Sequence, residues 1–178
     1  MLPKLSIKRL LTALALATCT LGGTYTVAYA QGTPGLVLFG KKDVNTLNYH
    51  LDFGGQPNAR DRYRLRIPGK KLRGGAAKFF ISYPDYFDGK FDTDRVEVRI
   101  KKDKQESLPI QEVIWDKESR IIQIDLEEPL KENRKVEIVF HNVKNPNVGT
   151  YYFFCQVLPA TDLPIREQLG AWVVSINR

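Results

Sequence analysis

An arginine stands at every second position of one segment of this 178-residue sequence: Arg60, Arg62, Arg64 and Arg66. In a β-strand, alternate side chains lie on the same face of the sheet. A row of guanidinium groups offers paired N–H donors that match phosphate, sulfate and carboxylate groups. The pattern therefore predicts a surface that contacts an anionic partner. The alternative interpretation is an edge strand whose charges keep it solvated and prevent edge pairing.

More basic residues follow in what we expect to be a loop: Lys70, Lys71, Arg73 and Lys78. Arg95, Arg99 and Lys101 form a second alternating row, which Glu97 interrupts. These residues extend the predicted basic surface. The expected partner is an envelope or membrane-associated protein, an acidic polysaccharide or lipid head groups.

Four carboxylates occur close together around Gly89: Asp85, Asp88, Asp92 and Asp94. Calcium takes oxygen ligands in flexible geometry, so this 85–94 segment is a weak candidate for a calcium-binding loop of a carrier domain. Its spacing differs from an EF-hand loop, and Asp and Gly are also the usual residues of turns. Aromatic residues at 83, 86, 87 and 91 either form an exposed contact platform or, as we favour, cover the end of the core.

The sequence offers no recognisable catalytic set. A Cys–His hydrolase would need Cys155 beside His50 or His141, with an activated thiolate. Cys155 stands in the middle of an apolar segment, which indicates a buried, inert thiol. We find no nucleophile elbow, phosphate-binding glycine loop or zinc-protease motif. We therefore predict a protein that is not an enzyme and needs no cofactor.

The first thirty residues have the layout of a secretory signal peptide. A basic start is followed by an apolar segment at 10–21, and Ala28 and Ala30 form the small-x-small pattern that precedes a cleavage site. We expect cleavage between Ala30 and Gln31. The apolar segment is shorter than the roughly 20 residues of a membrane-spanning helix. Lipidation of Cys19 is the alternative, because residues 16–19 resemble a lipoprotein signal.

Removal of this signal would change the charge of the protein. The signal contains three of the 27 basic residues and none of the 20 acidic ones, so the net charge falls from +7 to +4. Export and this modest charge argue against nucleic-acid binding. We expect an exported protein with no transmembrane span after cleavage.

The rest of the chain has the residue pattern of an all-β protein. With 43% hydrophobic and 26% charged residues it is globular in composition. Apolar residues alternate or run together at 36–39, 62–67, 79–83, 96–101, 112–116, 120–126, 136–140, 151–158 and 171–176. This spacing predicts an antiparallel, immunoglobulin-like β-sandwich, with a loose lead-in at 31–35 and one domain at 36–178. Asp162, Pro164 and Gly170 suggest at most one short helix.

The start of the predicted strand at 151–158 makes the fold prediction more specific. Tyr151 follows Gly149 and opens a long apolar segment, as in the tyrosine corner of immunoglobulin-type sandwiches. There the hydroxyl of the tyrosine is tied back to the preceding loop. Because residues 151–158 are apolar on both faces, we expect a strand that lies inside a sheet or is covered by another element or a partner.

Several short motifs together resemble a known family: YPDYF (83–87), GKFD (89–92), VIWD (113–116), VEIVF (136–140), VKNP (143–146), GTYYFF (149–154) and LGAW (169–172). They resemble a cyanobacterial family of exported proteins of the domain-of-unknown-function 2808 type, over residues 36–176. The resemblance implies export to the periplasm or thylakoid lumen. It supplies no catalytic residues.

Overall fold

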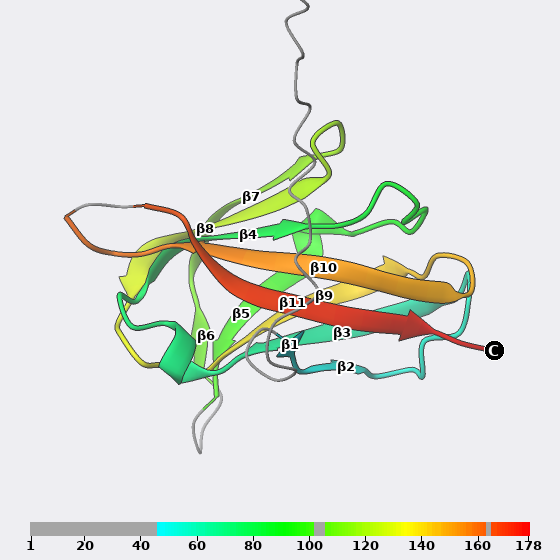
Figure 1. Cartoon of the computed structure of the whole chain (residues 1–178), viewed down its shortest axis with the longest axis horizontal. Coiled ribbons are helices and arrows are strands. Elements are labelled where there is room, and N and C mark those ends of the chain that lie inside the picture. Colours follow the sequence, from blue (N-terminus) through cyan, green and yellow to red (C-terminus); the bar gives the residue numbers. More distant parts are fainter. Residues whose placement is uncertain (1–45, 102–105, 163–164) are drawn as a thin grey trace, which may run out of the picture. The chain divides into compact units, whose positions relative to one another are not determined.

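Two β-sheets make up the described part of the protein (Figure 1). The computed structural model describes residues 46–101, 106–162 and 165–178. One sheet contains six strands: β1 (Thr46–Leu47), β4 (Ala76–Ser82), β7 (Ile110–Asp116), β8 (Ile121–Leu130), β10 (Gly149–Leu158) and β11 (Glu167–Ile176). The other contains five: β2 (Tyr49–Leu51), β3 (Arg60–Ile67), β5 (Val96–Ile100), β6 (Glu106–Leu108) and β9 (Val136–Lys144).

The strand order is β1-β11-β10-β4-β8-β7 in the six-stranded sheet and β2-β3-β9-β5-β6 in the five-stranded sheet. All neighbouring strands are antiparallel except β1 and β11, which pair in parallel over two residues. Two short 3₁₀ helices, η1 (Gly69–Lys71) and η2 (Thr93–Arg95), lie between strands. Among the described residues no helix is long and apolar enough to cross a membrane. The predicted all-β, immunoglobulin-like sandwich is confirmed.

Apolar residues and arginines alternate along β3, so the apolar side chains point to one face of the sheet and the arginines to the other. Tyr63, Leu65 and Ile67 are fully buried in the core. From the six-stranded sheet, Phe153 and Trp172 join the same core and are equally inaccessible to water. Burial of this apolar surface holds the two sheets together.

The tyrosine corner at the start of β10 is confirmed. The hydroxyl of Tyr151 donates a hydrogen bond to the carbonyl of Asn147, with an O–O distance of 2.9 Å. β10 lies between β11 and β4, so the prediction of an internal strand also holds. Cys155 of this strand is completely buried, and burial raises the pKa of its thiol above the ordinary value. A buried, unreactive thiol is what the sequence predicts.

The described residues between 160 and 170 contain no helix. β11 begins at Glu167 and continues through Gly170, which has a φ of 143°. The register between β10 and β11 shifts between Cys155 and Gln156, opposite Gly170. The glycine therefore lies at a β-bulge and does not end a helix. Pro164, the predicted strand at 36–39 and the signal peptide lie outside the described residues.

The aromatic residues of the 83–91 segment mainly close the end of the core. Phe87 and Phe91 are buried, and both rings pack against Phe153 with centroid distances of 5.2 and 6.0 Å. Tyr86 differs, since 56% of it is exposed. The core-covering interpretation therefore holds for the two phenylalanines.

Candidate functional site

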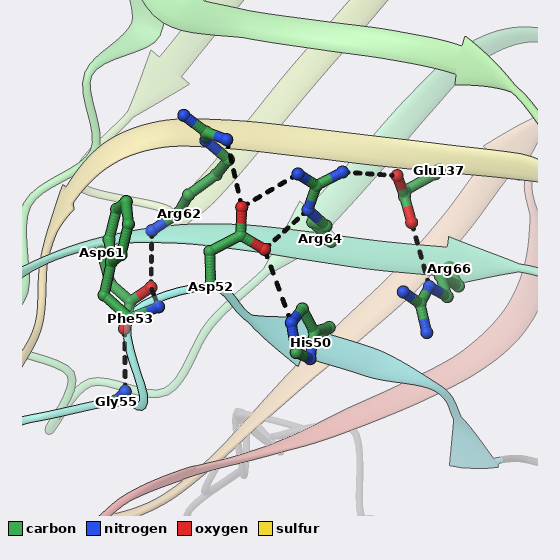
Figure 2. A network of polar contacts seen from close by, with 9 residues as sticks. All are labelled: His50, Asp52, Phe53, Gly55, Asp61, Arg62, Arg64, Arg66 and Glu137. Carbon is green, nitrogen blue, oxygen red and sulfur yellow. Dashed lines mark hydrogen bonds and ion pairs between the residues drawn. The ribbon is translucent and has the colours of Figure 1, made fainter. Parts of the chain in front are cut away.

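The predicted row of arginines lies on the face of the five-stranded sheet that points away from the core, here called the outer face. Arg60, Arg62, Arg64 and Arg66 all project from β3 opposite the buried residues of that strand. Figure 2 shows three of them in contact with acidic side chains from neighbouring segments. The sequence predicts the shared face of the arginines but not these acidic partners.

Asp52, directly after β2, binds two of the arginines. Arg64 donates from Nε and Nη2 to the two oxygens of this carboxylate at 2.6 and 2.9 Å, and Arg62 donates from Nη1 at 3.1 Å. His50 Nε2 lies 3.6 Å from the same group. The hydrogen bond from Arg64 is the main reason that the pKa of Asp52 is lowered. Asp52 is thus held in its charged form.

Glu137 of β9 binds the next pair of arginines. Arg66 donates from Nε at 2.9 Å and Arg64 from Nη1 at 3.4 Å. Only 2% of the Glu137 side chain is exposed. Burial by itself raises the pKa of this carboxyl, but the hydrogen bond and charge of Arg66 outweigh it, so the net shift is downward. A carboxylate at this depth depends on its arginine partners.

These residues form an alternating chain of charges, here called the arginine ladder: Arg62, Asp52, Arg64, Glu137 and Arg66. Three arginines share two carboxylates. Arg64, in the middle, donates from three nitrogens, whereas Arg62 and Arg66 at the ends each donate to a carboxylate from one. The ladder therefore carries excess positive charge and has N–H groups left over at its two ends.

The outer face continues across β9 to β5. Glu97 of β5 lies 2.6 Å from Arg99 Nη2 and 2.8 Å from His141 Nε2. Burial opposes ionisation of Glu97, but the hydrogen bond and charge of Arg99 produce a lowered pKa. Val139 lies between Glu97 and Arg64 in the strand register and is fully buried. The charges of Glu97 and Arg99 therefore balance each other, whereas the ladder has one more arginine than carboxylates.

Arg60 lies beyond the Arg62 end of the ladder. Its Nη1 donates to the backbone carbonyl of Asn142 at 3.0 Å. A neutral carbonyl leaves the charge of the guanidinium uncompensated. Arg60 thus adds to the positive charge at this end of the outer face.

The other predicted basic residues are dispersed. Lys71 donates to the carbonyl of Leu169 at 2.6 Å, and burial lowers the pKa of its ammonium group. Lys70 and Arg73 are exposed in and beside η1. Lys78 does not lie in the loop, contrary to the prediction, but in β4 of the other sheet, where Asp125 binds it.

Two of the four aspartates around Gly89 have separate hydrogen-bond partners. Asp88 accepts hydrogen bonds from the backbone N–H and side-chain amide of Asn147, at 3.2 and 2.7 Å. Asp92 accepts one from Asn142 at 2.8 Å. Across the described ranges, no group of three or more His, Cys, Asp or Glu side chains is placed to hold a metal ion. Asp85 lies in a turn and Asp94 in η2, and all four aspartates lie between β4 and β5.

The residues considered for a Cys–His hydrolase lie apart. Cys155 points into the core from the six-stranded sheet, while His50 and His141 contact Asp52 and Glu97 on the outer face of the five-stranded sheet. This arrangement gives the buried thiol no histidine partner among the described residues.

The chain belongs to the family described as "Protein of unknown function (DUF2808)", whose match spans residues 36–176. The family resemblance seen in the sequence is confirmed at this level. None of the curated proteins compared with this chain matches it.

Similar folds occur among solved structures. They include BslA, described as a bacterial hydrophobin (11% identity, TM-score 0.49, covering 74% of this chain and 92% of that one), and the collagen-binding domain of a Staphylococcus aureus adhesin (9%, 0.43, 74% and 97%). An uncharacterised Nocardia farcinica protein with an immunoglobulin-like fold is also similar (7%, 0.42, 75% and 99%).

Proposed function

We propose that this protein is an exported, non-catalytic binding domain of a cyanobacterial envelope or thylakoid lumen, and that its outer face contacts an anionic partner. One observation carries the proposal: three arginines share two carboxylates, which leaves unused guanidinium N–H groups at both ends of the ladder. Arg60 adds a further charge at the Arg62 end. The partner we expect is a membrane-associated protein with an acidic surface.

The ladder favours binding because it fixes the arginine side chains in advance. A free arginine side chain loses conformational freedom when it is immobilised in an interface, and that loss weakens binding. Here Asp52 and Glu137 already orient the guanidinium groups. The planar donors are then ready for paired hydrogen bonds to carboxylate or phosphate oxygens. The carboxylates of the ladder thus have a positioning role, and the arginines at its ends make the contact.

The test removes two arginine charges without disturbing the ladder's centre. In the double variant Arg60→Ser, Arg62→Ser, Asp52 keeps its two hydrogen bonds from Arg64. We expect about tenfold weaker capture of the partner from detergent-solubilised membranes of the producing cells, equivalent to about 1.4 kcal/mol. Capture is quantified by mass spectrometry, and thermal unfolding verifies that the variant is folded.

The matched control removes two exposed charges from the β7–β8 turn. Lys117→Ser, Arg120→Asn lowers the net charge equally, and asparagine tolerates the positive φ of 56° at residue 120. We expect this variant to capture the partner like the unmodified protein. Equal capture by the two double variants would contradict the proposal, because net charge and not the outer face would then govern binding.

A further inference from the structure

A pocket of about 260 Å³ lies at the Arg66 end of the ladder. It forms where the chain passes from one sheet to the other, and there the carbonyl of Asn48 accepts the backbone N–H of Arg66 at 2.9 Å. Leu47 and Ile67 line it as core residues that are 2% and 0% exposed, so they offer a ligand almost no surface. Apart from Pro68, all other lining residues are polar or charged. The pocket therefore suits a hydrophilic ligand.

Three cationic side chains line the pocket: Arg66, Lys101 and Lys135. Glu137 binds Arg66 through Nε, and Figure 2 shows both Nη groups of Arg66 pointing away from that carboxylate. Lys101 donates its backbone N–H to the carbonyl of Lys135 at 2.9 Å. This bond places the two lysines beside each other, directly after β5 and directly before β9. Both are exposed, and neither forms an ion pair with a carboxylate of the described residues.

The charge of this group of residues is strongly positive. Glu137 is the carboxylate that binds Arg66, and its single charge is shared with Arg64. Three cations beside one shared carboxylate attract an anion and repel a metal cation. The pocket is thus a candidate anion site.

The donors indicate which anion fits. Arg66 offers a planar pair of N–H groups, whereas each lysine is a compact charge that can approach a separate oxygen. A carboxylate group has two oxygens and one negative charge. A phosphate group is tetrahedral, and as a monoester it has three acceptor oxygens and about −1.5 to −2 charges at pH 7. It can therefore contact all three cations at once, with a charge that matches theirs more closely.

We propose that this pocket binds a phosphate group, with its oxygens on Arg66, Lys101 and Lys135 and polar contacts from Thr46 and Asn48. The group is either a free phosphate ion or the phosphomonoester end of a small organic molecule. The inference goes beyond the proposed function, because it assigns a small ligand to residues other than Arg60 and Arg62.

Titration of the purified protein with inorganic phosphate, followed by NMR, tests the proposal. We expect saturable shifts of the amide signals of Asn48, Arg66 and Lys101. The double variant Lys101→Ser, Lys135→Ser should weaken binding about tenfold or more, because two of the three charged donors are lost. Thermal unfolding verifies that the variant is folded.

Two controls separate the pocket from general attraction between charges. The variant Lys117→Ser, Arg120→Asn removes the same number of charges elsewhere and should bind phosphate like the unmodified protein. Acetate, a planar carboxylate with one charge, should bind at least about tenfold more weakly than phosphate. Phosphate binding that does not saturate, that ignores the two pocket lysines or that acetate equals would overturn the proposal.

A parallel titration with glycerol 3-phosphate distinguishes the two sources of the phosphate group. Tighter binding than that of inorganic phosphate, with the same dependence on Lys101 and Lys135, would support a phosphomonoester. Lysine-dependent binding of inorganic phosphate that is at least as tight would support the free ion.

The variant Arg60→Ser, Arg62→Ser separates this inference from the proposed function. If partner capture depends on these two arginines while phosphate fails to bind the unmodified protein, the pocket proposal is wrong and the proposed function stands. If phosphate binds as expected while partner capture ignores Arg60 and Arg62, the reverse holds.

Discussion

Replacement of Glu137 by alanine is expected to lower the free energy of unfolding by about 2–4 kcal/mol. The carboxylate is almost completely buried on the outer face and binds Arg64 and Arg66. Its removal leaves two guanidinium groups side by side without the anion that separates them. Loss of one partner from a fully buried pair costs about 3–5 kcal/mol, and the partial exposure of both arginines reduces that figure here. Urea denaturation measures the change.

The pH dependence of this stabilisation follows from the lowered pKa of Glu137 in the folded protein. A carboxyl with a depressed folded pKa contributes stability above its unfolded pKa and loses that contribution as the pH falls through the folded value. The difference in stability between the unmodified protein and Glu137→Gln should therefore be constant near neutral pH and decrease below about 4.5, the ordinary pKa of the group. A pH-independent difference, or an alanine variant as stable as the unmodified protein, would contradict the account of the ladder.

Replacement of Asp61 by alanine should have an even larger effect, about 3–5 kcal/mol. Asp61 lies on the core side of β3 and is fully buried. Its carboxylate accepts backbone N–H groups from Phe53, Gly55 and Arg62 at 3.0, 2.8 and 2.6 Å. Alanine leaves these donors without partners, at a cost of about 1–3 kcal/mol for each donor that water cannot reach.

Asparagine at position 61 is the matched control, because its carbonyl oxygen can still accept one or two of these hydrogen bonds. We expect Asp61→Asn to recover part of the stability that Asp61→Ala loses. Hydrogen exchange at residues 53–55 should accelerate in both variants, and more in the alanine variant. Unchanged exchange in this segment would show that Asp61 does not hold it.

Asp61 also connects the core to the outer face. It fixes Phe53 and Gly55, the segment that directly follows Asp52 of the ladder. Asn145 supports the same segment by donating to the carbonyl of Gln56 at 2.8 Å. A buried polar network thus sets the position of the ladder's first carboxylate. Loss of Asp61 should therefore disturb the outer face as well as overall stability.

Much of the fold follows from alternation along single strands. Tyr63, Leu65 and Ile67 are apolar at every second position, so the sequence alone indicates which face of β3 is buried and where its arginines point. β1, β2 and β6 have only two or three residues each. Such short segments cannot show the alternation of apolar and polar residues, so the sequence does not predict these strands. The bulge beside Gly170 depends on pairing between strands, which local sequence does not reveal.

The candidate site depends on the register between strands. For this reason the sequence indicated the arginines of the site but not their acidic partners. Glu137 contacts Arg66 because the two residues pair across β3 and β9, 71 positions apart in the chain. Asp52 reaches Arg64 because β2 pairs with β3 in antiparallel register. The only signal in the sequence is a charged residue among apolar ones, as with Glu137 between Val136 and Ile138. That signal marks an outward position but does not identify its partners.

Site-specific photocrosslinking in intact producing cells tests the central claim most directly. A photoreactive phenylalanine analogue is introduced at position 50 or 60 on the outer face, and at position 117 on the β7–β8 turn of the other sheet. His50 and Arg60 are exposed, so the label is accommodated at both outer-face positions. If the outer face is the binding surface, both positions yield the same crosslinked partner and position 117 does not. A partner captured from position 117 alone, or equally from all three positions, would contradict the claim.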